Sequence, residues 1–167
     1  NVTTSLANSA GGLNSTHTIS VAGIYDTVGE SIDTRTVTIA ANASAKLISD
    51  QLNAQMPNTN VGFTAKTGVV ISDADNDNTI TFKLSNNNGG TVTISANITT
   101  DNLNNLKDAI NAQTGTTGIT ASNGVVAQDD AGNPIWTLSN DSLLLTHSSG
   151  EDIAITELTG VALNVRP

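Results

Sequence analysis

Residues 36–57 read TVTIAANASAKLISDQLNAQMP, and this stretch decides the fold because it combines a strand pattern with a helix pattern. Residues 36–39 alternate threonine with valine or isoleucine, which is typical of a half-buried strand. Residues 45–56 carry apolar side chains at intervals of three and four positions, which predicts a helix with one apolar stripe. Ser44 is placed to cap its first turn, and Pro57 prevents its continuation. The stripe consists of Ala45, Ile48, Leu52 and Met56.

Parts of this stretch return later in the chain, which indicates an internal duplication. Four pairs of similar segments occur in the same order, with offsets of 54 to 58 residues. A composition biased toward Thr, Val and Asn explains one such match, whereas four in the same order favour a duplicated module. The pairs are 36–42 with 91–97, 52–55 with 110–113, 63–70 with 119–126, and 84–86 with 138–140.

The second copy also contains a predicted helix, over residues 101–113. Thr100 or Asp101 is placed to cap this helix, and Gly115 is expected to end it. Both predicted helices are short and would be marginal in water by themselves, so each is expected to pack on the apolar face of a sheet. The stripe of the second helix consists of Leu103, Leu106 and Ile110.

Strand patterns joined by polar turns follow each helix, and a further alternating strand is predicted at 18–22. We therefore predict a strand-rich α+β fold of two duplicated β-α-β-β modules, each a short helix packed on a small antiparallel sheet. The first module, with an N-terminal lead-in, covers residues 1–90, and the second covers 91–167. The predicted strand pairs are 61–72 with 79–84, 118–127 with 135–138, and 142–146 with 152–156.

The composition disfavours several classes of function. The chain of 167 residues has a formal net charge of −9, which argues against nucleic acid or an anionic membrane as a partner, because both require a basic surface. No apolar run is long enough to span a membrane. No cysteine is present, which excludes disulfides, thiolate zinc sites and a cysteine nucleophile. With two histidines and little clustered charge, we expect neither enzymatic activity nor a cofactor.

Asp73, Asp75 and Asp77 alternate in a predicted turn, and this spacing resembles the first half of a calcium-binding loop. Such loops continue with a glycine and close with an acidic residue, but Asn78 and Leu84 stand at those positions. The favoured interpretation is a solvated turn between strands, and a calcium site is the weaker alternative.

His17 and His147 are the two imidazoles of the chain. Ser148, His147 and Asp152 supply the side chains of a Ser-His-Asp set, but no nucleophile motif surrounds them. We therefore interpret both histidines as surface or strand residues without a catalytic role.

Trp136 and Phe82 stand on equivalent predicted strands of the two copies. One interpretation is a platform for stacking sugars, and the other, favoured because aromatic residues are scarce, is packing on the sheet. Asn-x-Ser/Thr triplets are about as frequent as chance predicts for this composition, so they carry no information about glycosylation. They begin at Asn1, Asn14, Asn42, Asn97 and Asn140.

The order of strand, helix ending in Ile-Asn or Leu-Asn, Thr-Ala segment and further strands resembles the flagellin hook IN motif. The asparagine of that motif corresponds to Asn111, and to Asn53 in the first copy. Residues 36–70 and 91–156 carry the resemblance. The first copy departs from the motif in having leucine before the asparagine and Phe63 where isoleucine or valine is usual.

The resemblance implies a surface-exposed outer domain of a bacterial flagellin or flagellar hook-associated protein, located outside the cell on the flagellum. It implies a structural role in filament surface, stability and antigenic properties, with exposed Ser and Thr as candidates for O-linked glycans. Contacts with neighbouring flagellin subunits would use regions outside this chain, so the isolated domain is expected to be a monomer. The alternative is a domain of a secreted bacterial adhesin that binds carbohydrate or protein and is stabilised by calcium.

Overall fold

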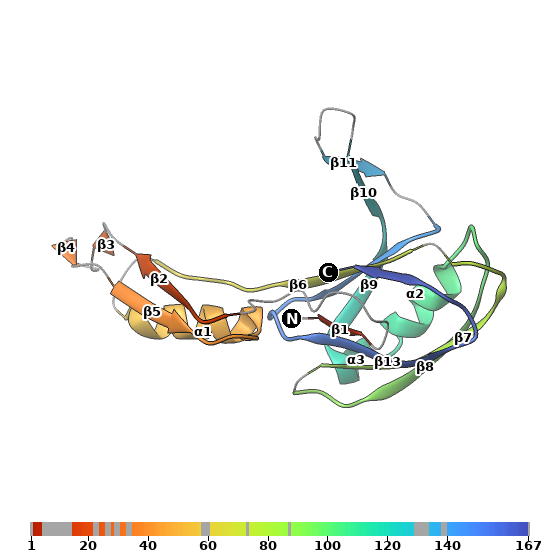
Figure 1. Cartoon of the computed structure of the whole chain (residues 1–167), viewed down its shortest axis with the longest axis horizontal. Coiled ribbons are helices and arrows are strands. Elements are labelled where there is room, and N and C mark those ends of the chain that lie inside the picture. The colour runs from red at the N-terminus through yellow and green to blue at the C-terminus, as the bar shows by residue number, and fades with distance from the viewer. Residues whose placement is uncertain are drawn as a thin grey trace.

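The computed structural model describes residues 2–4, 15–21, 24–25, 28, 31–32, 35–57, 61–72, 74–86, 88–128, 134–137 and 140–166. These residues form a strand-rich α+β fold, which confirms the predicted fold class. The described chain is elongated, with a small lobe at one end and a larger one at the other (Figure 1). We call residues 15–66 the small lobe, and residues 67–166 together with 2–4 the large lobe.

Two four-stranded sheets form the large lobe. Every pairing within them is antiparallel except that of β1 with β13, which is parallel. The first sheet consists, in spatial order, of β1 (Val2–Thr4), β13 (Ile153–Thr159), β7 (Asn78–Asn86) and β8 (Val92–Ile98). The second consists of β14 (Asn164–Arg166), β6 (Thr67–Ser72), β12 (Leu143–His147) and β9 (Ile119–Asn123).

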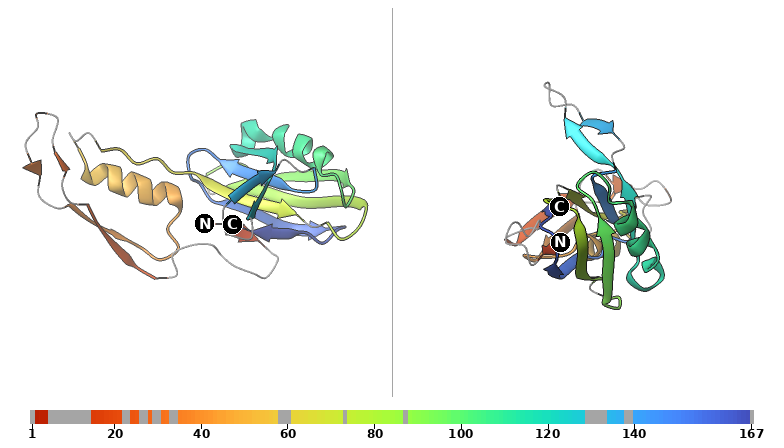
Figure 2. Two further views of the ribbon diagram at one scale, coloured as in Figure 1. Left: turned by 90° about the horizontal axis from the view of Figure 1, so that it is seen from above. Right: turned by 90° about the vertical axis from the view of Figure 1, so that its right-hand side faces the viewer.

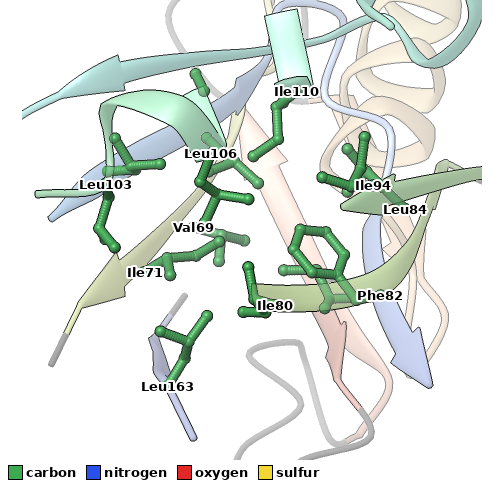
Figure 3. Packing of buried hydrophobic residues seen from close by; sticks show 14 of the residues in the cluster. Val69, Ile71, Ile80, Phe82, Leu84, Ile94, Leu103, Leu106, Ile110 and Leu163 are labelled. Carbon is green, nitrogen blue, oxygen red and sulfur yellow. The ribbon is translucent and has the colours of Figure 1, made fainter. Parts of the chain in front are cut away.

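Helix α2 (Asn104–Asn111) joins the two sheets at one side, because it packs on their edge strands β8 and β9. A single further turn, α3 (Thr114–Thr117), follows it. Alternate residues of the strands and one stripe of α2 point into a common core (Figure 3). Side chains that are fully buried there include Ile80, Leu84, Leu103, Leu106 and Ile110.

The small lobe has its own, much smaller core. Strand β2 (His17–Val21) pairs antiparallel with β5 (Arg35–Ile39), helix α1 (Ala45–Gln55) packs on β5, and the extended segment 61–66 runs alongside α1. The short strands β3 (Ile24–Tyr25) and β4 (Ser31–Ile32) form a separate pair. The core consists of Val37, Ile39, Ala43 and Leu52, with Ile19, Ile48 and Phe63 partly buried against them.

A two-stranded hairpin projects from the large lobe (Figures 1 and 2). It is formed by β10 (Val125–Gln128) and β11 (Pro134–Thr137), which pair antiparallel. This hairpin confirms the pairing expected between 118–127 and 135–138 for the part of each range that it covers.

The first predicted helix is confirmed, together with both of its end signals. The Ser44 hydroxyl accepts a hydrogen bond of 3.1 Å from the Leu47 N–H, which satisfies one of the free donors of the first turn. The last helical residue is Gln55 and the C-cap is Met56, directly before Pro57.

The ends of the second helix were predicted wrongly. α2 begins at Asn104, without a side-chain cap from Thr100 or Asp101, because those residues belong to a turn closed by a bridge between residues 99 and 102. Gly115 lies inside α3, and the stop is Gly118, whose φ of 68° is the left-handed conformation that suits glycine.

Two of the three predicted strand pairs are wrong. β6 and β7 lie in different sheets, as do β12 and β13, because each strand crosses to the opposite layer so that both layers bury an apolar face in one core. Each four-stranded sheet therefore contains strands from both sides of residue 90. Residues 67–86, assigned above to the first module, contribute to the core of the large lobe.

Candidate functional site

Two asparagines hold the end of a helix to the strand segment that follows it. In the small lobe, Asn53 Nδ2 donates a hydrogen bond of 2.8 Å to the Phe63 carbonyl oxygen, and Asn53 Oδ1 accepts one of 2.8 Å from the Phe63 N–H. In the large lobe, Asn111 Nδ2 donates to the Ala121 carbonyl oxygen at 2.9 Å, and Asn111 Oδ1 accepts from the Ala121 N–H at 2.8 Å. We call these contacts the asparagine braces.

The two braces have the same geometry because a carboxamide presents one donor and one acceptor in a plane, as a neighbouring strand does. In both cases the partner residue lies ten positions after the asparagine. The same offset of 58 residues relates the helix stripes, since it matches Ala45, Ile48 and Leu52 to Leu103, Leu106 and Ile110. The sequence pattern identified both asparagines, but it aligned Phe63 with Ile119 and so missed the partner of each brace.

A glycine joins the two lobes. The Lys46 N–H, in the first turn of α1, donates a hydrogen bond of 2.9 Å to the Gly150 carbonyl oxygen. Gly150 has a φ of 75°, and a Cβ added there would collide with the Cβ of Ala65. The turn between β12 and β13 can therefore reach the small lobe only with glycine at this position, a requirement that the sequence analysis did not detect.

A polar pocket of about 260 Å³ lies beside this junction. Its buried wall includes the Glu151 carboxylate, whose Oε1 accepts a hydrogen bond of 2.7 Å from Asn88 Nδ2. At its exposed wall, Lys46 Nζ lies 2.6 Å from Asp50 Oδ2. The hydrogen bond to Asp50 and the charge of that carboxylate raise the pKa of Lys46 above its ordinary value. The lining residues are Ser44, Lys46, Leu47, Asp50, Asn88 and Glu151.

His147 lies in β12, where it is buried and bonded on both ring nitrogens. Asn86 Nδ2 lies 3.2 Å from Nε2, and Ser149 Oγ, rather than that of Ser148, lies 3.1 Å from Nδ1. Asn86 Oδ1 accepts hydrogen bonds from the backbone N–H groups of residues 88 and 89, so its Nδ2 must face the ring as a donor. Both ring nitrogens of His147 are therefore engaged by neighbouring side chains of the protein.

His17, the other imidazole, is exposed on β2. Its Nε2 lies 3.0 Å from Ser15 Oγ, a local contact between neighbours on the surface.

Two carboxylates of the predicted turn, which was also the weaker candidate for a calcium site, accept hydrogen bonds from backbone N–H groups. Asp75 Oδ1 accepts a hydrogen bond of 3.2 Å from the Ala162 N–H, and Asp77 Oδ1 accepts one of 2.8 Å from the Thr100 N–H. Asp73 lies outside the described residues. Among the residues that the structure describes, no three His, Asp or Glu side chains are grouped closely enough to hold a metal ion.

The structure describes the side chain of one of the two paired aromatic residues, Phe82. Phe82 is buried in the large core, as the packing interpretation predicts, and the side chain of Trp136 lies outside the described part of the chain. Three triplet asparagines, Asn42, Asn97 and Asn140, are exposed, and Asn1 and Asn14 are not described.

The outward faces of the strands carry hydroxyl groups that pair across neighbouring strands. Thr81 Oγ1 lies 3.1 Å from Ser95 Oγ on β7 and β8, and Thr120 Oγ1 lies 3.0 Å from Thr146 Oγ1 on β9 and β12. These pairs give a polar surface that is largely uncharged.

No described helix is both long and apolar enough to cross a membrane. Comparison with protein-family models found no match to the chain, and comparison with curated proteins found none either.

Proposed function

We propose that the chain is a structural, surface-exposed domain of a bacterial flagellar filament protein, built from two copies of one unit. The observation that carries the proposal is the pair of asparagine braces, because Asn53 and Asn111 are the residues that correspond to the asparagine of the IN motif. Both make the same two hydrogen bonds to a residue ten positions later.

The order of elements supports the duplication. In the small lobe a strand pair, β2 and β5, leads into α1 and then into the extended segment 61–66. In the large lobe a strand pair, β7 and β8, leads into α2 and then into β9. In both units the helix packs on the strand that directly precedes it. The unit is thus better written as strand, strand, helix, strand.

The surface supports a role based on shape. The exposed strand faces are rich in paired hydroxyls, and the formal net charge is −9, which keeps crowded copies soluble without long flexible side chains. The first and last described strands, β1 and β14, lie close together (Figure 2). This arrangement is common in domains that are inserted in a longer chain.

Labelling of filaments tests the proposal. Antibodies raised against the purified chain should bind along flagellar filaments of cells that produce it, as seen by immunogold electron microscopy. Preimmune serum and a strain from which the coding region for this domain is deleted are the controls. Label confined to the cell body, with none on the filaments, would overturn the flagellar assignment.

A further inference from the structure

We propose that residues 61–65 form an antiparallel strand pair with the same residues of a second copy of this chain, around a two-fold axis at Phe63. The contact is a backbone interface at the open edge of the small lobe. The proposal rests on the geometry of the two lobes and does not depend on the flagellar assignment.

In the large lobe, the strand that corresponds to residues 61–65 is β9, and it has a bonded neighbour on each side. β9 has the Asn111 brace on one side, which occupies the backbone groups of Ala121, and β12 on its other side. Because neighbouring residues of a strand point their N–H and C=O groups to opposite sides, β12 is bonded through the residues that flank Ala121. These are Thr120 and Ser122, which stand opposite residues 146 and 144.

The small lobe has the asparagine brace, but among the described residues no strand corresponds to β12. The Asn53 brace occupies the backbone groups of Phe63, and the residues that flank it, Gly62 and Thr64, correspond to Thr120 and Ser122. Gly62 and Thr64 are exposed, and their backbone groups have no hydrogen-bond partner among the described residues. An edge with free N–H and C=O groups is a template for another strand.

A hollow lies where the missing strand would place its inward side chain. This space, of about 260 Å³, is lined on one side by Ile48 and Leu52 of α1 and on the other by Phe63 and Ala65, and Ala45, Ser49, Thr64 and Lys66 complete the lining. In the large lobe the corresponding position beside Ala121 is taken by Leu145 of β12, which is completely buried. The hollow therefore has room for one large side chain, and its walls are mainly apolar.

A second copy fits this edge because the edge is complementary to itself. When two copies pair antiparallel about Phe63, Gly62 of each copy lies opposite Thr64 of the other copy. Each of these two residue pairs exchanges two hydrogen bonds. The Phe63 side chain of the second copy then lies on the helix side of the sheet, next to the hollow. Residues 61–65 contain neither a charge nor a proline, the two devices that usually block edge pairing.

The contact is expected to be weak. Two five-residue strands bury much less than the roughly 1,200 Å² of a stable protein interface. The isolated chain therefore stays a monomer in dilute solution, and the pair forms where copies are crowded, as on a surface or in an assembly.

Nuclear magnetic resonance of the full, unmodified chain tests the proposal directly. Raising the protein concentration should shift the amide signals of Gly62 and Thr64, while the amides of Thr120 and Ser122, already paired with β12, stay unchanged. The variant Thr64→Pro removes one of the free N–H groups, and proline also favours an extended backbone at the preceding residue, as strand pairing requires, so the shift at Gly62 should disappear. Unchanged signals of Gly62 and Thr64 at all concentrations would overturn the proposal.

A cysteine trap gives an independent measurement, because the natural chain contains no cysteine. Opposed residues of a non-hydrogen-bonded antiparallel pair have Cα atoms about 4.5 Å apart, within disulfide range. Under mild oxidation Phe63→Cys should give disulfide dimers roughly tenfold faster than Thr93→Cys, a control on the exposed face of β8. Circular dichroism checks that both variants are folded, and equal dimerisation rates of the two folded variants contradict the proposed contact.

Discussion

The two lobes carry the same local pattern in very different surroundings. α1 and α2 share the spacing of their apolar stripes and end in the same asparagine brace. The stripe of α2 is completely buried, with Leu106 and Ile110 at 0% exposure, because the helix packs on the edge strands of both four-stranded sheets and faces their common core. The stripe of α1 faces one strand pair and one extended segment, so Ile48 remains partly exposed. The local pattern is sufficient for the helix and its brace, and the number of covering strands decides how stable they are.

This difference predicts an order of unfolding. The small core has few members among the described residues, and the Lys46 to Gly150 hydrogen bond is one of the contacts that join it to the large lobe. Regions with few buried apolar contacts open at lower free energy than a large core does. The small lobe should therefore open first, while the large lobe stays folded.

The largest expected effect comes from removing matched core side chains in the two helices. Ile110→Ala should lower the free energy of unfolding of the large lobe by about 3–5 kcal/mol, because a fully enclosed site leaves a cavity. Leu52→Ala, at the matching position of α1, should lower it by about 2 kcal/mol or less, and only in the small lobe, because that core can collapse. Denaturant unfolding followed by circular dichroism measures the first effect, and hydrogen exchange of individual amides locates the second. Equal losses spread over both lobes would show that the chain unfolds as one unit.

A smaller effect is expected from removing the braces. Asn111→Ala should destabilise the chain by about 1–3 kcal/mol, because the backbone groups of Ala121 are then left unpaired at a buried position. Asn53→Ala should cost less than about 1 kcal/mol, since water reaches the backbone of Phe63. Hydrogen exchange at the Ala121 and Phe63 amides reports each brace.

The aspartate variants separate the two hydrogen bonds of a brace. Asn111→Asp keeps an acceptor for the Ala121 N–H and removes the donor to its carbonyl oxygen, so its effect should fall between the natural chain and Asn111→Ala. If Asn53→Ala and Asn111→Ala destabilise equally, the proposed difference in burial does not control the braces.

The sequence predicted those features that depend on neighbouring residues. The stripe of α1, its Ser44 cap and its end before Pro57 were all correct, because each is a matter of local spacing. The partners of strands were not predictable in this way. Apolar and polar residues alternate in both 67–72 and 78–86, and this pattern suits a pairing of the two strands with each other as well as a place in two different sheets. Which of the two arrangements forms depends on the common core.

The same limit applies to the site. The motif identified Asn53 and Asn111, but their hydrogen-bond partners depend on how the next segment returns past the helix. Gly150 was not identified, because its role depends on Ala65, which is 85 positions earlier in the chain. Tertiary contacts of this kind leave no periodic signal in the sequence.

The smallest expected effect is that of calcium on the melting temperature of the chain. This measurement tests the adhesin alternative, because the candidate calcium loop lies in the large lobe, which is already well packed. A site at 100 times its dissociation constant would stabilise the chain by about 2.7 kcal/mol, which raises the melting temperature by roughly 5–10 °C. We expect a shift of less than about 1 °C in millimolar calcium, because Asp75 and Asp77 each already accept a backbone hydrogen bond. Asp75→Asn keeps an acceptor for the Ala162 N–H and removes the charge, so it should melt like the natural chain with and without calcium. A large calcium-dependent shift that this variant abolishes would instead place a metal site in the loop between β6 and β7, and would favour a calcium-stiffened adhesin domain over a flagellar one.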